Sequence, residues 1–351
     1  MSEDCLKLTT YFGERDRTDG RLLADALFEL YGGRELELSV MLRGIEGFGR
    51  HHSNHTELLL SMSEDLPVIS VAVDTRERIE ALLPEVMGFK RAGLVTLERA
   101  RLLAGAQAQF DAPRDLPARL QDEIKLTVYV GRHERAGGRP AFVAICELLQ
   151  RHGLHGATVL LGVDGTRDGA RARARFIARN AQVPMMVVSV GEAGAVAAAT
   201  GELAQLLARP LVTLEQVRVC RRDGVAVGEP RTDAPQLPPA VSEWWQKLTV
   251  HSTEDDRLEG HPLHRLLLRE LRTLRVAGAT SMRGVWGFHD DRPPHGDRLL
   301  QLRRHTPVMT IVVDRPQRIA EIYPTVERLT AGSGLVTLES VPVAIAPQAE
   351  H

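Results

Sequence analysis

Apolar and polar residues alternate near the start of the chain. The even-numbered residues from 6 to 12 are mainly apolar, and Lys7, Thr9 and Tyr11 lie between them. This period of two predicts a β-strand with one buried face. After Gly20, apolar residues recur three and four positions apart along residues 22–31, and this spacing predicts a helix with one buried face.

Two further apolar runs and a second helical pattern follow. Residues 38–45 predict a second strand, and residues 67–73 predict a third, which begins at a proline. A helical pattern runs through Ile79 and Leu82, and residues 94–98 predict a fourth strand. The expected order is therefore β-α-β-β-α-β.

The same pattern occurs three times, which indicates an internal repeat. Lys-Leu-Thr begins at residues 7, 125 and 247, and Leu-Val-Thr-Leu-Glu begins at residues 94, 211 and 335. These two motifs are 87, 86 and 88 residues apart, so the repeated segment has a nearly constant length. The matching first helices are expected after Gly138 and Gly260, and Asp74 and Asp314 are expected to cap the second helices of the first and third copies.

These repeats divide the chain into three domains and two linkers. The domains are residues 1–103, 123–221 and 244–346, here called repeats one, two and three, and the linkers are residues 104–122 and 222–243. The linkers are rich in Pro, Gly, Ala and charged residues. About 20 residues of extended chain can span tens of ångströms, enough to connect one repeat's last strand to the next repeat's first.

The element order predicts an α+β fold. A β-α-β-β-α-β segment forms the ferredoxin-like arrangement, a four-stranded antiparallel sheet with both helices on one face. Such a sheet buries only one face by itself, and the alternation leaves Thr9 and Tyr11 on the other face. We therefore expect the second faces of the three sheets to pack together.

Composition narrows the class of protein. Of 351 residues, 43% are hydrophobic and 26% are charged, and the net charge is −2. This balance favours a globular protein and gives no case for nucleic acid as a partner. We expect no membrane insertion, because no apolar run approaches 20 residues. Three cysteines in no paired motif are consistent with reduced thiols, so we expect a cytoplasmic protein.

A glycine turn follows the second strand in each repeat. It comprises residues 43–49, 161–167 and 283–289, always begins 36 residues after the lysine of Lys-Leu-Thr, and places two glycines three residues apart. Backbone amides at such a turn can bind an anion, and an arginine at its start could pair with a phosphate. The alternative is that the glycines only shape the chain's exit from the strand. The candidate ligand-binding residues are Arg43, Gly44, Gly47, Gly49, Arg283, Gly284 and Gly287.

Repeat one resembles domain-of-unknown-function family 190, which is classed with the PII-like signalling proteins. The resemblance is carried by Lys-Leu-Thr-x-Tyr-Phe-Gly-Glu at 7–14, Arg-Gly-Ile-Glu-Gly-Phe-Gly at 43–49, Glu-Asp-Leu-Pro-Val at 64–68 and Gly-Leu-Val-Thr-Leu-Glu at 93–98. It covers residues 5–102 and extends to repeat three. Repeat two departs from it, with Thr166-Arg167 in place of Phe48-Gly49 and Gly191 in place of Asp74.

This resemblance implies a fold and a mode of binding. Single-domain PII-like subunits form trimers, and relatives bind nucleotides in the clefts between subunits, with a mobile loop after the second strand reporting the ligand. The resemblance therefore implies that the three fused repeats form a pseudo-trimer within one chain, which is compatible with a monomer. Leu161 replaces the arginine in repeat two, so repeats one and three are expected to be more competent in ligand binding.

A second recurrent set of candidate binding residues follows the first strand of each repeat. Arg17, Arg135 and Arg257 occupy equivalent positions, and each is preceded by an acidic residue. They could face a cleft and bind the ligand, or form surface ion pairs worth less than about 1 kcal/mol.

The loops after the glycine turns differ in chemistry. The first carries His51, His52 and His55, the second an arginine series from Arg167 to Arg175, and the third carries His289 and His295 with two aspartates. The histidines are suitable metal ligands but lack a tight spacing such as His-Glu-x-x-His. A metal site at His51, His52 and His55 and a solvated loop both remain open.

Taken together, the sequence predicts a PII-like regulator that is not an enzyme, since it shows no catalytic motif. It would bind a small anionic effector, with an adenine nucleotide as first candidate, at the clefts between repeats, and act on a protein partner through its loops. One alternative is a metal-binding or hydrolytic protein that uses the loop histidines and carboxylates. Another is a structural assembly without a ligand.

Overall fold

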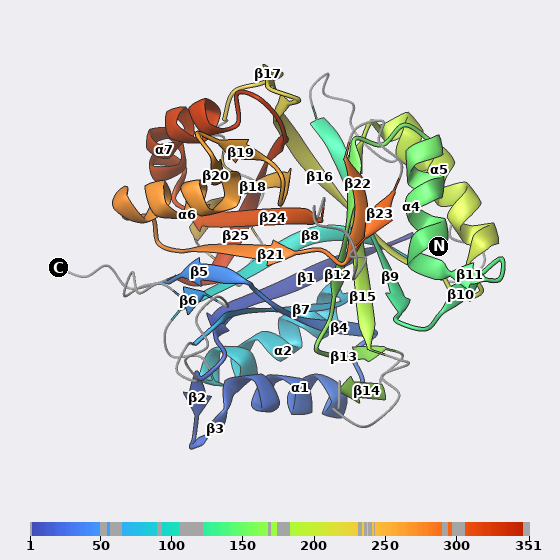
Figure 1. Cartoon of the computed structure of the whole chain (residues 1–351). Coiled ribbons are helices and arrows are strands. Elements are labelled where there is room, and N and C mark those ends of the chain that lie inside the picture. Colours follow the sequence, from blue (N-terminus) through green and yellow to red (C-terminus); the bar gives the residue numbers. More distant parts are fainter. Residues whose placement is uncertain are drawn as a thin grey trace.

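The three repeats fold with their elements in the same order. The computed structural model describes residues 2–49, 55–56, 65–89, 93–104, 122–167, 170–173, 183–230, 234, 237, 241, 243–289, 294–296 and 306–346. Within these residues there are six helices and a mainly antiparallel sheet of 19 strands to which all three repeats contribute. Figure 1 shows the helices in pairs on the outside of the molecule and the strands in its centre.

Repeat one shows how each sheet is built. Its elements are β1 (Ser2–Gly13), α1 (Leu23–Gly33), β4 (Leu38–Arg43), β7 (Pro67–Thr75), α2 (Arg76–Phe89) and β8 (Leu94–Ala104). β1 pairs antiparallel with β7 on one side and with β8 on the other, and β7 pairs antiparallel with β4. The first strand is therefore an inner strand of its sheet.

The other two repeats have the same pairing. Repeat two consists of β9 (Asp122–Gly131), α4 (Ala141–Arg151), β12 (Gly156–Leu161), β15 (Pro184–Gly191), α5 (Ala193–Leu206) and β16 (Leu211–Arg222). Repeat three consists of β18 (Glu243–Thr253), α6 (Leu263–Thr273), β21 (Ala279–Arg283), β24 (Pro307–Asp314), α7 (Pro316–Leu329) and β25 (Leu335–Ile345). The first helices begin three residues after Gly20, Gly138 and Gly260, close to where the sequence pattern predicts them.

A tight hairpin precedes the first helix of each repeat. The pairs are β2 (Arg17–Thr18) with β3 (Arg21–Leu22), β10 (Arg135–Ala136) with β11 (Arg139–Pro140), and β19 (Arg257–Leu258) with β20 (His261–Pro262). Four further short strands are β6 (His55–Thr56), β14 (Ala170–Arg173), β17 (Val225–Ala226) and β23 (His295–Gly296).

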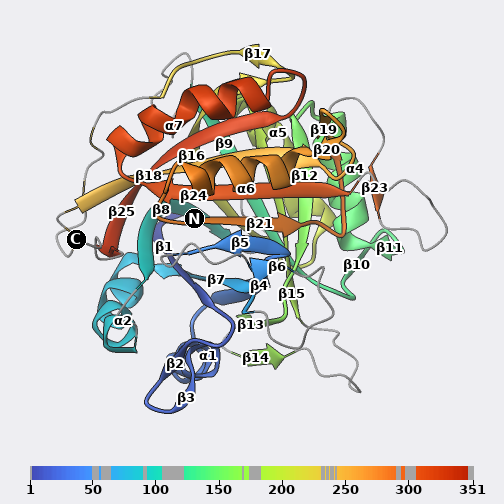
Figure 2. The same ribbon diagram turned by 60° about the vertical axis from the view of Figure 1, so that its left-hand side comes forward.

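Each sheet has an outer and an inner face. On the outer face of repeat one, Leu6 and Leu8 pack with Leu27 of α1 and Ile79 of α2. Figure 2 shows the helices of repeats one and three on opposite sides of the strands. The inner faces meet, because one apolar cluster contains residues of all three repeats. The alternation in the sequence therefore correctly separated the two faces of β1.

Three short strands within the glycine turns cross between repeats. β5 (Glu46–Phe48) of repeat one pairs with β21 of repeat three, β22 (Trp286–His289) of repeat three pairs with β12 of repeat two, and β13 (Asp164–Arg167) of repeat two pairs with β4 of repeat one. The exchange is cyclic. Each repeat extends the sheet of one neighbour and receives a strand from the other.

The two aspartates expected to cap helices have a different role. In repeat three the cap residue of α7 is Arg315, and no side chain caps it. Asp314 instead accepts hydrogen bonds from the amides of Ala277 and Arg315, both at 2.8 Å. Asp74 likewise accepts a hydrogen bond from the amide of Glu37 at 2.9 Å. The prediction of helix caps was wrong, because these carboxylates lie at the ends of their strands and hold the loop before the second strand.

Two observations bear on the expectations of reduced thiols and of no membrane insertion. Cys5, Cys146 and Cys220 are buried free thiols. In the part of the chain that the structure describes, no helix is both long enough and apolar enough to cross a membrane.

Candidate functional site

The glycine turns lie where one repeat's chain passes onto its neighbour's sheet. The amide of Gly44 donates to the carbonyl of Pro67 in its own repeat at 2.8 Å, and the next amide, of Ile45, donates to Ser281 of repeat three at 2.9 Å. Gly284 and Val285 repeat this arrangement with Pro307 and Val159. The amides of the second and third residues of the turn are therefore committed to two different sheets, so an anion at this position would have to be held by other groups.

The spacing of the glycines follows from this close crossing. A Cβ on Gly47 would lie 2.7 Å from the carbonyl oxygen of Ala279, and one on Gly165 would lie 2.4 Å from that of Ser39. At Gly287 the corresponding distance, to the carbonyl oxygen of Ala157, is 2.0 Å. Real Cβ atoms do not approach backbone oxygen so closely. The second glycine is required by the neighbour's backbone, whereas a Cβ on Gly49 would have no atom within 4 Å.

The arginines at the start of two turns have carboxylate partners. Arg43 lies 2.7 Å from Glu14, and Arg283 lies 2.7 Å from Glu254 at the equivalent position of repeat three. In repeat two these positions are Leu161 and Arg132, so arginine and glutamate are replaced together. Both arginines are partly exposed, with 47% and 35% of the side chain accessible. An anion would therefore compete with a glutamate for each guanidinium.

Arg17, Arg135 and Arg257 each bond to the turn of their own hairpin. Their guanidinium groups donate to the carbonyl oxygens of Gly20, Gly138 and Gly260. The acidic residue before each arginine accepts a hydrogen bond from the backbone at the end of the first strand. Of the two alternatives that the sequence left open, these local contacts agree better with a role at the surface than with one in a cleft.

Sequence reasoning missed a second shared site, at the centre of the molecule. Six buried side chains form a closed ring in which lysines and glutamates alternate, here called the ion-pair ring: Lys7, Glu98, Lys247, Glu339, Lys125 and Glu215. Each lysine contacts two glutamates and each glutamate contacts two lysines. Four of the six contacts have N–O distances of 2.5–2.9 Å. No side chain of the ring is more than 8% exposed.

The ring joins the beginning and end of every repeat. Each lysine belongs to a Lys-Leu-Thr motif, and each glutamate ends a Leu-Val-Thr-Leu-Glu motif. In every repeat the lysine contacts the glutamate of the same repeat, through Lys7–Glu98, Lys125–Glu215 and Lys247–Glu339. Each lysine also contacts the glutamate of one neighbouring repeat, through Lys7–Glu215, Lys125–Glu339 and Lys247–Glu98. The constant recurrence of these two motifs was the signal that could have revealed the ring.

The electrostatics of the ring are governed by burial and by the opposite charges. Burial opposes ionisation of Glu98, yet the neighbouring ammonium groups hold its pKa well below the usual value, and they also lower the pKa of Glu339. Although burial alone would lower the pKa of Lys7 and Lys247, the glutamates raise it above the ordinary value. For Lys125 burial prevails, and its pKa is lowered.

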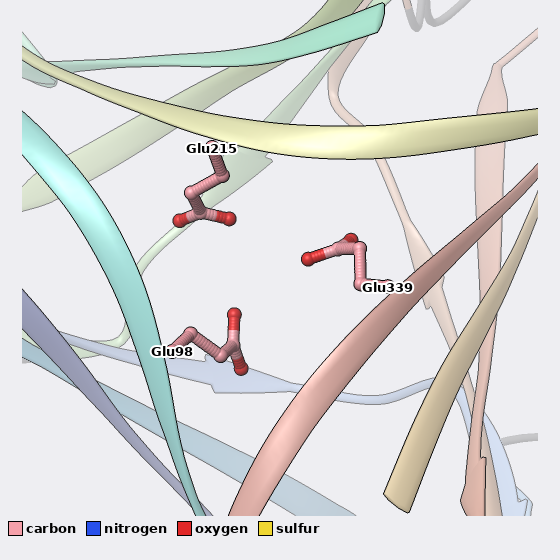
Figure 3. A group of neighbouring side chains, drawn as sticks. All are labelled: Glu98, Glu215 and Glu339. Carbon is pink, nitrogen blue, oxygen red and sulfur yellow. The ribbon is translucent and has the colours of Figure 1, made fainter. Parts of the chain in front are cut away.

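The three glutamates suggest a metal site, but their partners argue against one. Carboxylate oxygens of Glu98, Glu215 and Glu339 lie within 4.8 Å of one another, and Figure 3 shows the three side chains facing one another from β8, β16 and β25. Three lysines already balance their three charges. A cation would have to displace a buried ammonium group, which makes this arrangement an ion-pair network rather than a metal centre.

The histidines proposed as metal ligands fall largely outside the described residues. This applies to His51 and His52 and to the side chain of His55. The backbone of His55 pairs with Gly47 in β6.

A cavity of about 60 Å³ adjoins the ring on the inner faces of the sheets. All three repeats contribute to its apolar wall, with Leu42, Leu160 and Met282 at equivalent positions. Its polar lining includes Tyr11 and His251.

Comparison with known proteins agrees with the repeated architecture. The model of family DUF190, described as "Uncharacterized ACR, COG1993", matches residues 5–102, 123–219 and 245–343. The chain belongs to this family. A relative described as a UPF0166 protein of Aquifex aeolicus (strain VF5) is 29% identical over 96 residues, which are 27% of this chain and 90% of that protein. One relative of this kind therefore corresponds to a single repeat of the present DUF190 chain.

Among solved structures, an aspartate kinase from Synechocystis is similar to 96% of this DUF190 chain at 13% identity. The chain spans 43% of that protein's length, and the TM-score is 0.27. A likeness at this level carries no argument about fold or function.

Two glycines of one turn provide a test of the crossing geometry. We expect Gly47→Ala to lower the free energy of unfolding by about 1–3 kcal/mol, because the new methyl group would overlap the backbone of β21. Gly49→Ala, two residues away in open space, should change it by less than about 0.5 kcal/mol. Urea denaturation of both variants measures the difference, and equal effects would contradict the proposed role of the second glycine.

Removing one charge from the ion-pair ring should be costly, and removing a neighbouring pair should be less so. We expect Glu98→Gln to destabilise the protein by about 3–5 kcal/mol, because it leaves a buried positive charge uncompensated. Lys7→Met combined with Glu98→Gln restores neutrality and should cost less than the two single substitutions together. The exposed pair Arg21–Glu29 serves as a control, and Glu29→Gln should cost less than about 1 kcal/mol. Additive effects in the ring would contradict the coupling.

The ring should also make stability depend on acid pH. The pKa of Glu98 and Glu339 is lowered in the folded state, so their contribution is complete above the unfolded pKa of about 4.3 and is lost as pH falls through the lower folded value. Urea denaturation between pH 7 and pH 3 should show this loss. Glu98→Gln should weaken the dependence below about pH 4, and an unchanged slope would argue against the lowered pKa.

Proposed function

We propose that this chain is a PII-like regulatory protein in which three ferredoxin-like repeats form a pseudo-trimer within one polypeptide. It binds a small anionic effector at the clefts between repeats, with an adenine nucleotide as the first candidate, and acts on a protein partner through the loops that follow the glycine turns. The membership of the DUF190 family supports the general class. The cyclic exchange of strands supports the pseudo-trimer.

The observation that carries the binding proposal is the position of the crossing strands. β5, β13 and β22 each pair with a neighbouring repeat's sheet, and each precedes the stretch that the sequence predicts to be a loop. A ligand bound where two repeats meet would therefore contact elements of both repeats near the start of that loop. Binding free energy at this point can change the preferred arrangement of the loop, which is the requirement for a signalling response.

An anion could bind at Arg43 and Arg283 by replacing the glutamate that now pairs with each guanidinium. Each guanidinium is partly exposed and lies 2.7 Å from a glutamate carboxylate. A phosphate group can pair with arginine through two hydrogen bonds. The effector's phosphate would take the place of Glu14 or Glu254, and the released carboxylate would become available to the loop or to solvent.

We also propose that the protein binds without catalysis. The charged groups of the ion-pair ring are committed to one another, which supports a structural rather than a chemical role for the largest group of buried charges described above. The metal-binding or hydrolytic alternative depends on loop residues such as His51 and His52, so divalent metals belong in the same binding screen.

The proposal is tested by titrating the full chain with ATP, ADP and AMP in a calorimeter. We expect Arg43→Ala combined with Arg283→Ala to weaken nucleotide binding at least tenfold, since each charge-assisted hydrogen bond contributes about 1.5–3 kcal/mol. Glu14→Gln combined with Glu254→Gln should preserve or strengthen binding, because it removes the competing carboxylates. Unchanged affinity in the arginine variant would move the site elsewhere, and turnover of the nucleotide would contradict the absence of catalysis.

A further inference from the structure

The cavity at the centre of the molecule has charged residues only where it meets the ion-pair ring. Its volume is about 60 Å³, and residues of all three repeats line it. The charged residues of the described lining are ring members: Lys7, Glu98, Lys125, Lys247 and Glu339. Each of them already contacts two opposite charges. A charged ligand would have to break a buried ion pair, so the cavity favours an uncharged one.

The side walls of the cavity are apolar and follow the repeats. Three sets of equivalent residues form them: Leu42, Leu160 and Met282; Ile69, Met186 and Met309; and Val71, Val188 and Ile311. Apolar cavities of sufficient size stay dry and bind small apolar molecules. These walls therefore suit an alkyl chain.

One position on the inner faces breaks the repetition. The strand register makes Tyr11, Tyr129 and His251 equivalent, since they pair with Ile69, Met186 and Met309. Tyr129 is fully buried, and its hydroxyl lies 3.3 Å from that of Thr213. His251 lines the cavity, and its imidazole is shorter than a phenol. Repeat three therefore fills less of the centre than a tyrosine at this position would.

The imidazole of His251 also has an unused hydrogen-bonding atom. Its Nε2 is buried and makes no hydrogen bond to any residue that the structure describes. Buried polar atoms in native proteins are nearly always partnered, by protein, water or a ligand. Burial lowers the pKa of His251 to about 3, with smaller contributions from His289 and Lys125, so the ring is neutral at pH 7. A neutral imidazole nitrogen either donates or accepts, and a hydroxyl group can match both roles.

The volume of the cavity limits the size of a ligand. A dry cavity of about 150 Å³ holds benzene, so at the same density 60 Å³ has room for about two or three non-hydrogen atoms. A water molecule needs two to four polar partners, whereas the walls beside His251 are apolar. A hydroxyl group on a short alkyl chain matches the size, the walls and the imidazole together.

We propose that the central cavity binds a small uncharged molecule with one hydroxyl group and a short alkyl chain, with ethanol as the probe. The hydroxyl group pairs with Nε2 of His251, and the chain packs against the apolar walls. This site is separate from the clefts proposed for the anionic effector and goes beyond that function. Because all three repeats form the walls, a bound molecule stabilises their assembled arrangement.

Methionine methyl groups in the walls can report whether the cavity is occupied. The test is an ethanol titration of the full chain, labelled with ¹³C at the methionine methyl groups and followed by NMR. We expect saturable shifts at Met186, Met282 and Met309, which line the cavity. Met87, which is 43% exposed, reports the effect of the solvent and should show no saturable shift. Acetate, which is of similar size but charged, should produce none at any of the four.

Two variants test the proposed contacts. His251→Leu removes the imidazole at nearly constant volume and should weaken ethanol binding at least about threefold, the effect of one lost hydrogen bond. Val71→Ile combined with Val188→Ile gives every repeat the isoleucine found at Ile311 and adds two methyl groups to the walls. It should abolish the saturable shifts without lowering the melting temperature, because it fills the cavity.

The outcomes that contradict this site are distinct. Absence of saturable shifts at all three wall methionines would mean that the cavity holds water or nothing, and would overturn the proposal. Unchanged affinity in His251→Leu would do the same, and so would ethanol binding that persists in a folded double variant. If the double variant does not fold, His251→Leu decides. None of these results bears on nucleotide binding at the clefts.

Discussion

The buried ion-pair ring is the interaction on which the arrangement of the three repeats depends. Each repeat contributes one lysine and one glutamate that contact each other, and each of these side chains also contacts an opposite charge of a neighbouring repeat. Charges removed from water are tolerated only with well-placed partners. An arrangement of the repeats that opened the ring would deprive buried charges of one of their two partners, so the ring favours one relative placement of the three sheets.

The crossing strands β5, β13 and β22 also hold the three repeats together, at positions away from the ring. The ring joins the first and last strands at the centre, and β5, β13 and β22, which follow the second strands, pair with the neighbouring repeats. The requirement for glycine comes from backbone of the neighbouring repeat, as at Gly165 against Ser39. A feature that could be read as a phosphate-binding loop is thus explained first by packing, and ligand recognition must rest on the side chains around it.

Fusion of the repeats allows these equivalent places to diverge. The ring keeps the same residue types in all three repeats, because a change at any one position would unbalance the others. The clefts are under no such constraint, and one of them has acquired three histidines and two serines. Three separate identical subunits could not differ in this way.

The order of helices and strands, the two faces of β1 and the three repeats could be predicted from the sequence, because periodicity and recurrence are local properties of the chain. The residues with which the repeated lysines, aspartates and arginines interact could not be predicted from the sequence. Lys7 bonds to Glu215, 208 residues away, and Asp314 holds the loop before β21 rather than capping a helix. Arg43 and Arg283 were recognised as candidates, but their glutamate partners became visible only in the folded chain. Local spacing determines which face a side chain lies on, whereas the packing of three sheets decides what that side chain meets.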